Sequence, residues 1–193
     1  ALSLAAEGVE VWINGRNAGR LEAAADDIQH QTGRRPHTVV ADIDTADGRA
    51  VVLAACPAPD ILVCNSGGPK PGRLEDWTAT AWSEAVAAGM ISPILLIQAV
   101  IVGMRDRGFG RVVAGDGVTV NCILPEKVET DRLRQMTRSL ARIRKVDEAV
   151  ARAEMLASIP AGRVGRPSEV GDACTYLCSA QAGYITGQNL RVD

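Results

Sequence analysis

The sequence predicts an α/β protein: a doubly wound, mostly parallel sheet of the Rossmann type, in a single domain covering residues 1–193. Three observations predict this fold. Short apolar runs at 9–13, 37–41 and 61–64 have the composition of strands. Segments with helical periodicity alternate with them, which is typical of parallel α/β sheets. The run 61–64 is apolar throughout, as expected for a strand covered on both faces, and it stops at a turn of small, polar residues.

The N-terminal half predicts alternating helices and strands. Residues 1–7 have helix-forming composition and Gly8 is a natural stop, so a strand is expected at 9–13. In the next helix Leu21, Ala25 and Ile28 repeat at helical spacing, and Gly33 ends it. The further elements expected are a helix at 18–32, a strand at 37–41, a helix at 46–55, a strand at 61–64 and a helical region at 77–107 that Pro93 interrupts.

The C-terminal half continues the alternation. Strand composition recurs before and after a glycine-containing join, and the last helix carries a capping signal at Pro167, Ser168 and Glu169. The elements expected are strands at 111–113 and 118–122, a polar helix at 132–157, a capped helix at 168–179 and a last strand at 189–192.

The join at residues 114–117 conflicts with a parallel sheet. A crossover between parallel neighbours normally needs a dozen residues or more, so four residues would permit only a hairpin. The chain also opens inside a helix, without a preceding strand and glycine-rich turn. We therefore expect that the numbering joins pieces of a longer chain, with a break between Val113 and Ala114. A genuine truncation or deletion is the alternative.

Composition excludes several classes of function. The net charge of -2 gives no electrostatic footprint for nucleic acid or an acidic membrane surface. We expect no membrane span and a cytoplasmic protein, because the apolar runs are short and the five cysteines are too sparse for a disulfide scaffold. Cys174 and Cys178 have helical spacing that suits a zinc ligand pair, but no histidine is near them, so no metal site is predicted.

Five segments, in this order, resemble the short-chain dehydrogenase/reductase family, especially bacterial members of the 3-oxoacyl-carrier-protein reductase type. Residues 65–68 are similar to the family's Asn-Asn-Ala-Gly turn, and Trp82 with residues 108–113 to its central helix and fifth strand. Residues 120–125 with Thr130 resemble its cofactor loop. Residues 162–170 and 184–188 match its C-terminal pattern.

The resemblance implies hydride transfer between NADP(H) and a carbonyl or secondary alcohol, with a 3-oxoacyl thioester as one substrate. The family's catalytic Ser and Tyr-x-x-x-Lys are not in this sequence: Tyr176 and Tyr184 are followed four residues later by Ala180 and Gln188. We therefore assign no catalytic residue. A catalytically silent nucleotide-binding or scaffold protein is the alternative function.

Two further positions depart from the family. Gly89 stands where an asparagine holds a water, seven residues after Trp82. Glu126 stands where the cofactor loop has glycine, so we expect a carboxylate poorly placed against cofactor phosphates and a turn that does not tolerate a side chain.

The resemblance carries cofactor contacts onto nine positions. Arg16 follows a strand at the place where a basic residue meets the 2′-phosphate of NADP, so we expect NADP(H) rather than NAD(H); a solvated loop residue is the alternative. Asp42 and Ile43 would contact adenine, unless Asp42 is only a helix N-cap. The remaining contacts expected are Asn65, Ser66, Gly67, Pro125, Val128 and Thr130.

Two segments of the sequence predict binding partners. The arginine-rich stretch 132–145 lies where the family has a mobile lid and could meet a phosphopantetheine phosphate or an acidic carrier protein, or it is the wet face of a helix. The apolar helix from Trp82 to Met104 has more apolar surface than one sheet face covers, which favours a homodimer or homotetramer. A cofactor-free structure is expected, because glycine-rich turns often order on ligand binding.

Overall fold

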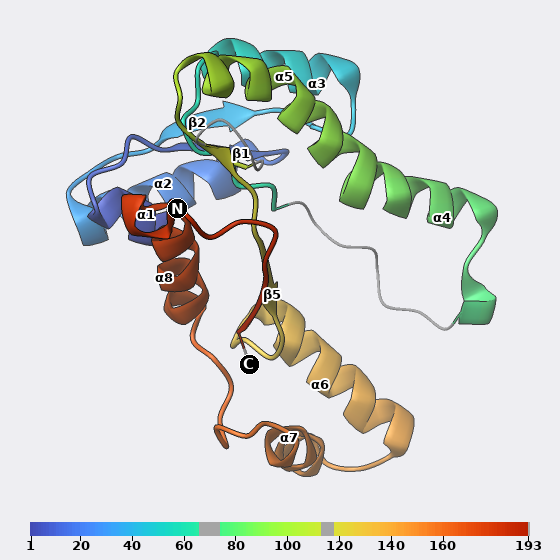
Figure 1. The fold of residues 1–193 in the computed structure, drawn as a ribbon. Helices are drawn as coiled ribbons and strands as arrows, with labels where there is room; N and C mark the ends of the chain where they lie inside the picture. Colours follow the sequence, from blue (N-terminus) through green and yellow to red (C-terminus); the bar gives the residue numbers. More distant parts are fainter. Residues whose placement is uncertain (66–73, 113–117, 193) are drawn as a thin grey trace. The chain divides into compact units, whose positions relative to one another are not determined.

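The computed structural model describes residues 1–65, 74–112 and 118–192 (Figure 1). The chain forms two compact units, Ala1–Val120 and Asn121–Asp193. Ser66, Gly67 and the expected break between Val113 and Ala114 lie outside the described residues.

The first unit alternates helices with short strands, as the sequence predicts. Its α-helices are α1 (Leu2–Ala6), α2 (Ala18–Thr32), α3 (Ala46–Ala55), α4 (Ala79–Val86) and α5 (Ser92–Asp106). A 3₁₀ turn, η1 (Leu74–Asp76), precedes α4, and a π-helical turn, η2 (Ala87–Ile91), joins α4 to α5. Its strands are β1 (Trp12–Gly15), β2 (His37–Val40), β3 (Gly110–Arg111) and β4 (Val118–Thr119).

Capping side chains fix the two best-predicted helices. Asn17 accepts a hydrogen bond from the backbone N–H of Arg20 at 2.9 Å at the start of α2, and Gly33 ends that helix with φ of 73°. Thr45 accepts from the N–H of Gly48 at 3.0 Å at the start of α3. Both helices have the bounds that the sequence predicts.

The pair β1–β2 is parallel, with Trp12 opposite His37 and Gly15 opposite Val40. Helix α2 packs on one side of this pair and α3 on the other, beside α5 (Figure 1). The first strand begins at Trp12 rather than at Val9, because the N–H of Val9 donates to the carbonyl of Leu4 at 3.1 Å and belongs to the turn that ends α1.

Strands β3 and β4 pair in parallel, with Gly110 opposite Val118 and Arg111 opposite Thr119. The expectation that the short join permits only a hairpin is therefore wrong. Each strand has only two residues, so this parallel ladder is far shorter than the strands for which a long crossover is normal. Val100, Met104, Val112 and Val118 form the buried core beneath this pair.

The run 61–64 was expected to be a strand buried on both faces, and this is wrong. Only Ile61 pairs, through one parallel bridge to Arg111. Leu62 packs against the core, whereas Val63 on the opposite face is half exposed. One face of this segment is thus covered within the first unit and the other is not.

The interruption at Pro93 takes the form of a π-helical turn rather than a break, and a continuous helix runs over Ala79–Asp106. A proline ring collides with the carbonyl four residues earlier, here that of Gly89, and widening the turn at Ala87–Ile91 makes room for it. An 18-residue window of this helix has a mean hydropathy of 2.3, so by length and composition it could cross a membrane, contrary to our expectation. One such helix is weak evidence for a membrane location.

The second unit pairs β5 (Cys122–Pro125) with β6 (Asn189–Val192) in parallel. The single helix expected at 132–157 is two, α6 (Asp131–Arg144) and α7 (Glu148–Ala157), because Lys145 adopts left-handed backbone angles with φ of 56°. Helix α8 (Pro167–Cys178) follows, and then the 3₁₀ turn η3 (Ala180–Ala182).

Candidate functional site

The carboxyl ends of β1 and β2 bring Arg16 and Asp42 together. A guanidinium nitrogen of Arg16 lies 3.8 Å from a carboxylate oxygen of Asp42, and both side chains are exposed. An exposed pair of this kind contributes less than about 1 kcal/mol, so Arg16 can exchange this carboxylate for another anion. Both residues were expected to follow strands of the same parallel sheet, and parallel strands end at the same edge of a sheet.

Asn14 links the two strands at this edge of the sheet. This role was not predicted from the sequence. The Asn14 side-chain amide donates to the carbonyl of Val39 at 2.9 Å and to that of Ala41 at 3.0 Å, so it ties the end of β1 to the end of β2. A polar residue inside an otherwise apolar strand was the available signal.

Asp42 is not the N-cap of α3, because Thr45 has that role. Instead the Asp42 carboxylate accepts from the N–H of Asp44 at 3.1 Å, which shapes the turn before the helix. Ile43 follows half-buried, and its carbonyl accepts from Arg49 at 2.8 Å. Gly48 lies so close to this turn that an added Cβ would be 1.9 Å from the Asp42 carbonyl oxygen.

Asn65 is the last residue described before the unassigned stretch 66–73, and its side chain is exposed. Its predicted neighbours Ser66 and Gly67 lie outside the described residues. Gly89, at the position where the family has asparagine, lies in η2, and an added Cβ there would have open space around it.

In the second unit, residues 125–130 form a loop pinned on both sides. The N–H of Glu126 donates to the carbonyl of Val192 at 3.2 Å, which extends the β5–β6 ladder past Pro125. Gly165 donates to the carbonyl of Lys127 and accepts from the N–H of Glu129, both at 2.9 Å, on either side of Val128.

Glu126 overturns one expectation. Lys145 is the non-glycine residue with positive φ in the described chain, so the backbone at Glu126 is one that any side chain tolerates. The Glu126 carboxylate accepts from Arg191 on β6 at 2.5 Å. Its charge is thus compensated within its own sheet pair.

Glu129 and Thr130 tie this loop to the helices that follow. The Glu129 carboxylate accepts from Arg152 of α7 at 2.6 Å and from Arg134 of α6 at 3.0 Å, and these hydrogen bonds lower its pKa. The hydroxyl of Thr130 caps α6 by accepting from the N–H of Leu133 at 3.3 Å. Neither role was predicted.

At least three of the six cations of the arginine-rich stretch form ion pairs within the second unit. Arg134 pairs with Glu129 and Asp131, Arg138 with Glu148 at 3.6 Å, and Arg144 with Glu154. These pairs favour the solvated helix face over a dedicated phosphate site.

Glu169 organises the turn before α8. Its carboxylate accepts from the backbone N–H of Arg166 at 2.6 Å and from both terminal nitrogens of Arg163 at 2.6 and 2.9 Å. The hydrogen bonds from Arg163 and then from Arg166 lower the pKa of Glu169 to about 2.

We expect Glu169→Gln to lower the melting temperature at neutral pH, because an amide cannot accept the same charge-assisted bonds. A carboxylate with a depressed pKa stabilises the fold above its ordinary pKa and loses that contribution as protons bind. The difference between wild type and variant should therefore shrink between about pH 4.5 and pH 2. Calorimetry over this range measures it, with the solvent-exposed Glu84→Gln as control; a difference independent of pH contradicts the assignment.

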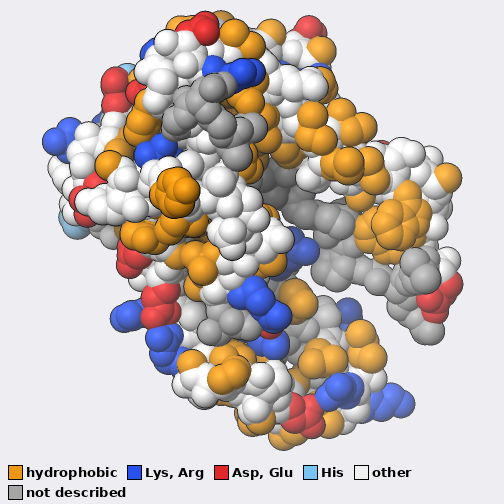
Figure 2. Space-filling view, in the orientation of Figure 1, with side chains coloured by type: hydrophobic (Ala, Val, Ile, Leu, Met, Phe, Trp, Pro, Cys, Tyr) orange, Lys and Arg blue, Asp and Glu red, His pale blue; other side chains and the backbone are white. Residues whose placement is uncertain are grey.

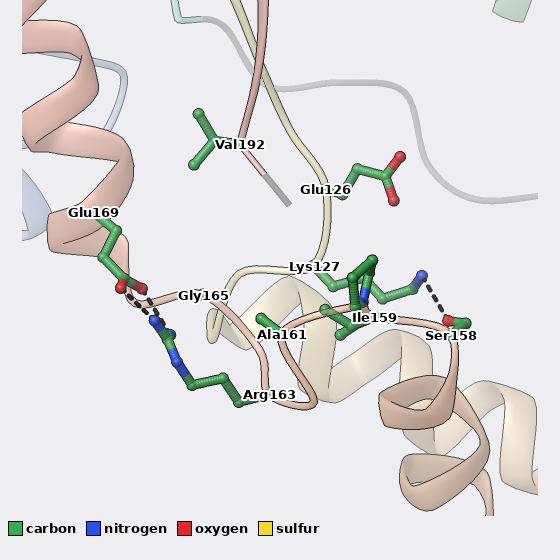
Figure 3. Close-up of a pocket in the computed structure, with 10 residues that line it drawn as sticks. Glu126, Lys127, Ser158, Ile159, Ala161, Arg163, Gly165, Glu169 and Val192 are labelled. Carbon is green, nitrogen blue, oxygen red and sulfur yellow. Dashed lines mark hydrogen bonds and ion pairs between the residues drawn. The ribbon is translucent and has the colours of Figure 1, made fainter.

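A pocket of about 160 Å³ opens beside this turn (Figure 3). Glu126 and Lys127 line it from the loop, Ser158 and Ile159 from the turn after α7, and Val192 from β6. Figure 3 shows the Lys127 side chain directed to Ser158, with its Nζ 3.2 Å from the serine Oγ.

Family models match the whole chain in two overlapping parts. Residues 1–114 match the short chain dehydrogenase model, and residues 106–193 match the model described as enoyl-(acyl carrier protein) reductase.

Curated relatives include reductases. An acetoacetyl-CoA reductase of Rhizobium meliloti (strain 1021) is 30% identical over 182 residues, covering 76% of this chain and 71% of the relative. The 3-oxoacyl-[acyl-carrier-protein] reductase FabG of Chlamydia trachomatis is 26% identical over 228 residues, covering 98% of this chain and 88% of the relative. Because that match is longer than the 193 residues here, the relative has residues inside it without a counterpart in this chain.

Solved structures share the fold. The NADPH-dependent reductase YwfH, involved in bacilysin biosynthesis, has a TM-score of 0.88 at 22% identity, covering 100% of this chain and 90% of its own. The L-sorbose reductase of Gluconobacter frateurii, complexed with NADPH and L-sorbose, has a TM-score of 0.87 at 22% identity, covering 100% of this chain and 88% of its own.

Proposed function

This chain belongs to the short-chain dehydrogenase/reductase family, and on that premise we propose that it is an NADP(H)-dependent oxidoreductase acting on a carbonyl compound or a secondary alcohol. The relatives named as acetoacetyl-CoA and 3-oxoacyl reductases favour a 3-oxoacyl thioester as substrate. A relative of Bacillus subtilis, 26% identical, is named an NADPH-dependent reductase, which favours NADP(H).

The observation that carries the proposal is the position of Arg16 beside Asp42, at the carboxyl ends of β1 and β2. Nucleotides bind at that edge of an open α/β sheet. Arg16 would donate to the 2′-phosphate of NADP(H), for which a planar guanidinium suits better than an ammonium. Asp42 would accept from the adenine amino group with Ile43 against the ring, and Asn65, Ser66 and Gly67 would continue the site along the edge.

We expect Arg16→Ser to weaken NADPH binding by roughly tenfold to a hundredfold, because a hydrogen bond to a charged group contributes about 1.5–3 kcal/mol. NADH, which lacks the 2′-phosphate, should bind unchanged. Fluorescence titration of both nucleotides measures this. The control is Arg34→Ser, which removes a charge before β2 rather than after β1. An equal loss for NADPH and NADH would contradict the role of Arg16.

Pro125, Val128 and Thr130 would approach the nicotinamide carboxamide from the pinned loop. The hydroxyl of Thr130 already accepts from the N–H of Leu133, so it has its own proton left to donate. Turnover is tested by NADPH oxidation with acetoacetyl-CoA. Oxidation that depends on both compounds supports the reductase.

A catalytically silent nucleotide-binding protein is the second candidate. The sequence has no tyrosine followed four residues later by lysine, and Gly89 replaces the family's asparagine. The longer match to the Chlamydia reductase is consistent with an internal deletion in this chain. NADPH binding without any acetoacetyl-CoA-dependent oxidation would favour this candidate, whereas failure to bind NADPH would sink both.

We also propose a cytoplasmic homo-oligomer that pairs through the apolar helix Ala79–Asp106. Large apolar side chains stay exposed along this helix and gather along it in Figure 2; they include Trp82, Val86, Met90, Ile91, Ile94 and Val102. Such a patch is usually covered by another surface, and symmetric association is the common solution.

Light scattering after size exclusion tests the oligomer. Wild type should have at least twice the mass of 20.3 kDa, and Met90→Glu should shift it toward the monomer. The control is Val150→Glu, an exposed apolar position in the second unit. A monomeric wild type would overturn this pairing, and its binding to lipid vesicles would identify a membrane surface as the partner instead.

A further inference from the structure

The pocket beside residues 126–127 has the size of a small-ligand site. Its volume of about 160 Å³ is comparable to cavities that hold a benzene-sized molecule. Its lining comes from separate segments of the second unit, so the pocket depends on the folded unit. Ile159, Pro160, Ala161 and Val192 supply apolar surface.

The four charged side chains that line the pocket sum to zero, but they do not all pair with one another. The Glu126 carboxylate pairs with Arg191 at 2.5 Å. The Glu169 carboxylate pairs with Arg163 at 2.6 Å. Lys127 is different, because the partner of its ammonium among the described residues is the neutral hydroxyl of Ser158, at 3.2 Å. Lys127 is therefore the lining cation whose described partner carries no compensating charge.

The hydrogen-bonding capacity of the Lys127 ammonium is also only partly used. Ser158 donates its hydroxyl proton to the carbonyl of Met155 at 2.7 Å, so its oxygen serves Lys127 only as an acceptor. An ammonium has three N–H donors, and this bond uses one of them. Figure 3 shows Lys127 and Ser158 among the residues that line the pocket. Two donors of this ammonium thus remain for a ligand.

We propose that this pocket binds a small monoanion with an apolar body, of the class of a short-chain carboxylate. The carboxylate would accept from the Lys127 ammonium, and the hydrocarbon part would lie against Ile159, Ala161 and Val192. A dianion such as phosphate fits less well, because one cation cannot compensate it and the carboxylates of Glu126 and Glu169 would repel it. The proposal does not rest on the proposed NADP(H) function, although Glu126 and Lys127 belong to the loop that carries Pro125, Val128 and Thr130.

The test is a protein-observed NMR titration of the full chain at constant ionic strength, with butyrate, the neutral butyramide and inorganic phosphate as probes. We expect saturable shifts at the backbone amides of residues 126–127 and 158–165 with butyrate. Butyramide and phosphate should bind more weakly by at least about tenfold, because each lacks either the charge or the apolar body that the pocket matches.

Variants separate this site from surface attraction of anions. Lys127→Met keeps most of the aliphatic stem and should weaken butyrate binding by about tenfold or more, whereas Lys127→Arg should retain it. The matched control is Arg142→Met, which removes a cation of the second unit away from the pocket. Equal binding of butyrate and butyramide, unchanged binding in Lys127→Met, or tighter binding of phosphate would each overturn the proposal. If Lys127→Met fails to fold, the comparison of probes on wild type still decides.

Discussion

Replacing Gly48 with alanine is expected to lower the free energy of unfolding of the first unit by about 3 kcal/mol. The added Cβ would lie 1.9 Å from the carbonyl oxygen of Asp42, 2.5 Å from its carbonyl carbon and 2.9 Å from the Oγ1 of Thr45. Two of these are backbone atoms, which cannot rotate away as a flexible side chain can. The turn at Asp42 or the first turn of α3 must therefore move.

Urea unfolding followed by tryptophan fluorescence measures this loss selectively, because Trp12, Trp77 and Trp82 all lie in the first unit. The matched control is Gly19→Ala, also in the first turn of a helix, where the nearest atom to an added Cβ is the Asn17 Oδ1 at 3.6 Å. That change should be neutral or stabilise the unit by up to about 1 kcal/mol. A loss below about 1 kcal/mol for Gly48→Ala would show that the turn adapts.

The same variant links stability to the candidate site. Asp42 keeps its position through the turn that Gly48 approaches, and Asp42 is the residue beside Arg16. We expect Gly48→Ala to weaken the binding of NADPH and NADH alike, because it displaces the proposed adenine contact rather than the 2′-phosphate contact. Arg16→Ser should affect only NADPH, so titration with both nucleotides distinguishes the two variants.

The sequence predicts those parts of the fold that local physics determines. Helices α2 and α3 have their predicted bounds because Asn17 and Thr45 cap them and Gly33 ends the first. The α/β class is confirmed by the solved structures that share the fold, and the family resemblance by the two family models. All three strand ladders in the described residues are parallel, as the alternation of helix and strand predicts.

Tertiary context decides the rest. Lys145 splits the helix expected at 132–157, although lysine is a good helix former and gives no local signal of a left-handed residue. Val63 is half exposed in a run that looked buried on both faces, because cover on the second face depends on elements far away in sequence. The π-helical turn before Pro93 likewise replaces the break that proline alone would predict.

In the candidate site, too, the sequence implies some contacts, whereas others are visible only in the tertiary structure. Arg16 and Asp42 meet because they follow parallel neighbours, which the sequence order already implies. Glu126 was expected to be misplaced, yet its partner Arg191 is 65 residues further along the chain and becomes visible only when β5 and β6 pair. The role of Glu129 was missed for a similar reason, since its partner Arg152 belongs to a helix that the sequence does not separate from α6. The cofactor contacts themselves stay predictions.

Replacing Met104 with alanine is expected to cost about 3 kcal/mol, the second large effect. Met104 has no exposed surface and contacts the buried core under β3 and β4. Removing its Cγ, Sδ and Cε leaves a cavity that the rigid core fills only in part. Tryptophan fluorescence in urea again measures the loss, with Val51→Ala, at an exposed apolar position of the same unit, as control.

Gly110 of β3 lies against the Met104 side chain and therefore gives a second test of the packing at this position. An added Cβ at Gly110 would lie 2.8 Å from the Cβ and the Sδ of Met104 and 2.9 Å from its Cγ. Gly110→Ala alone should therefore cost about 2 kcal/mol through overpacking. Combined with Met104→Ala it should cost about 1 kcal/mol less than the sum of the single changes, because two of the three crowded atoms are gone while the Cβ stays. Strictly additive losses would mean that the Cβ added at Gly110 moves β3 away from α5 instead of pressing on Met104. In that case the loop before β3, and not the contact with Met104, would determine where Arg111 pairs with Ile61.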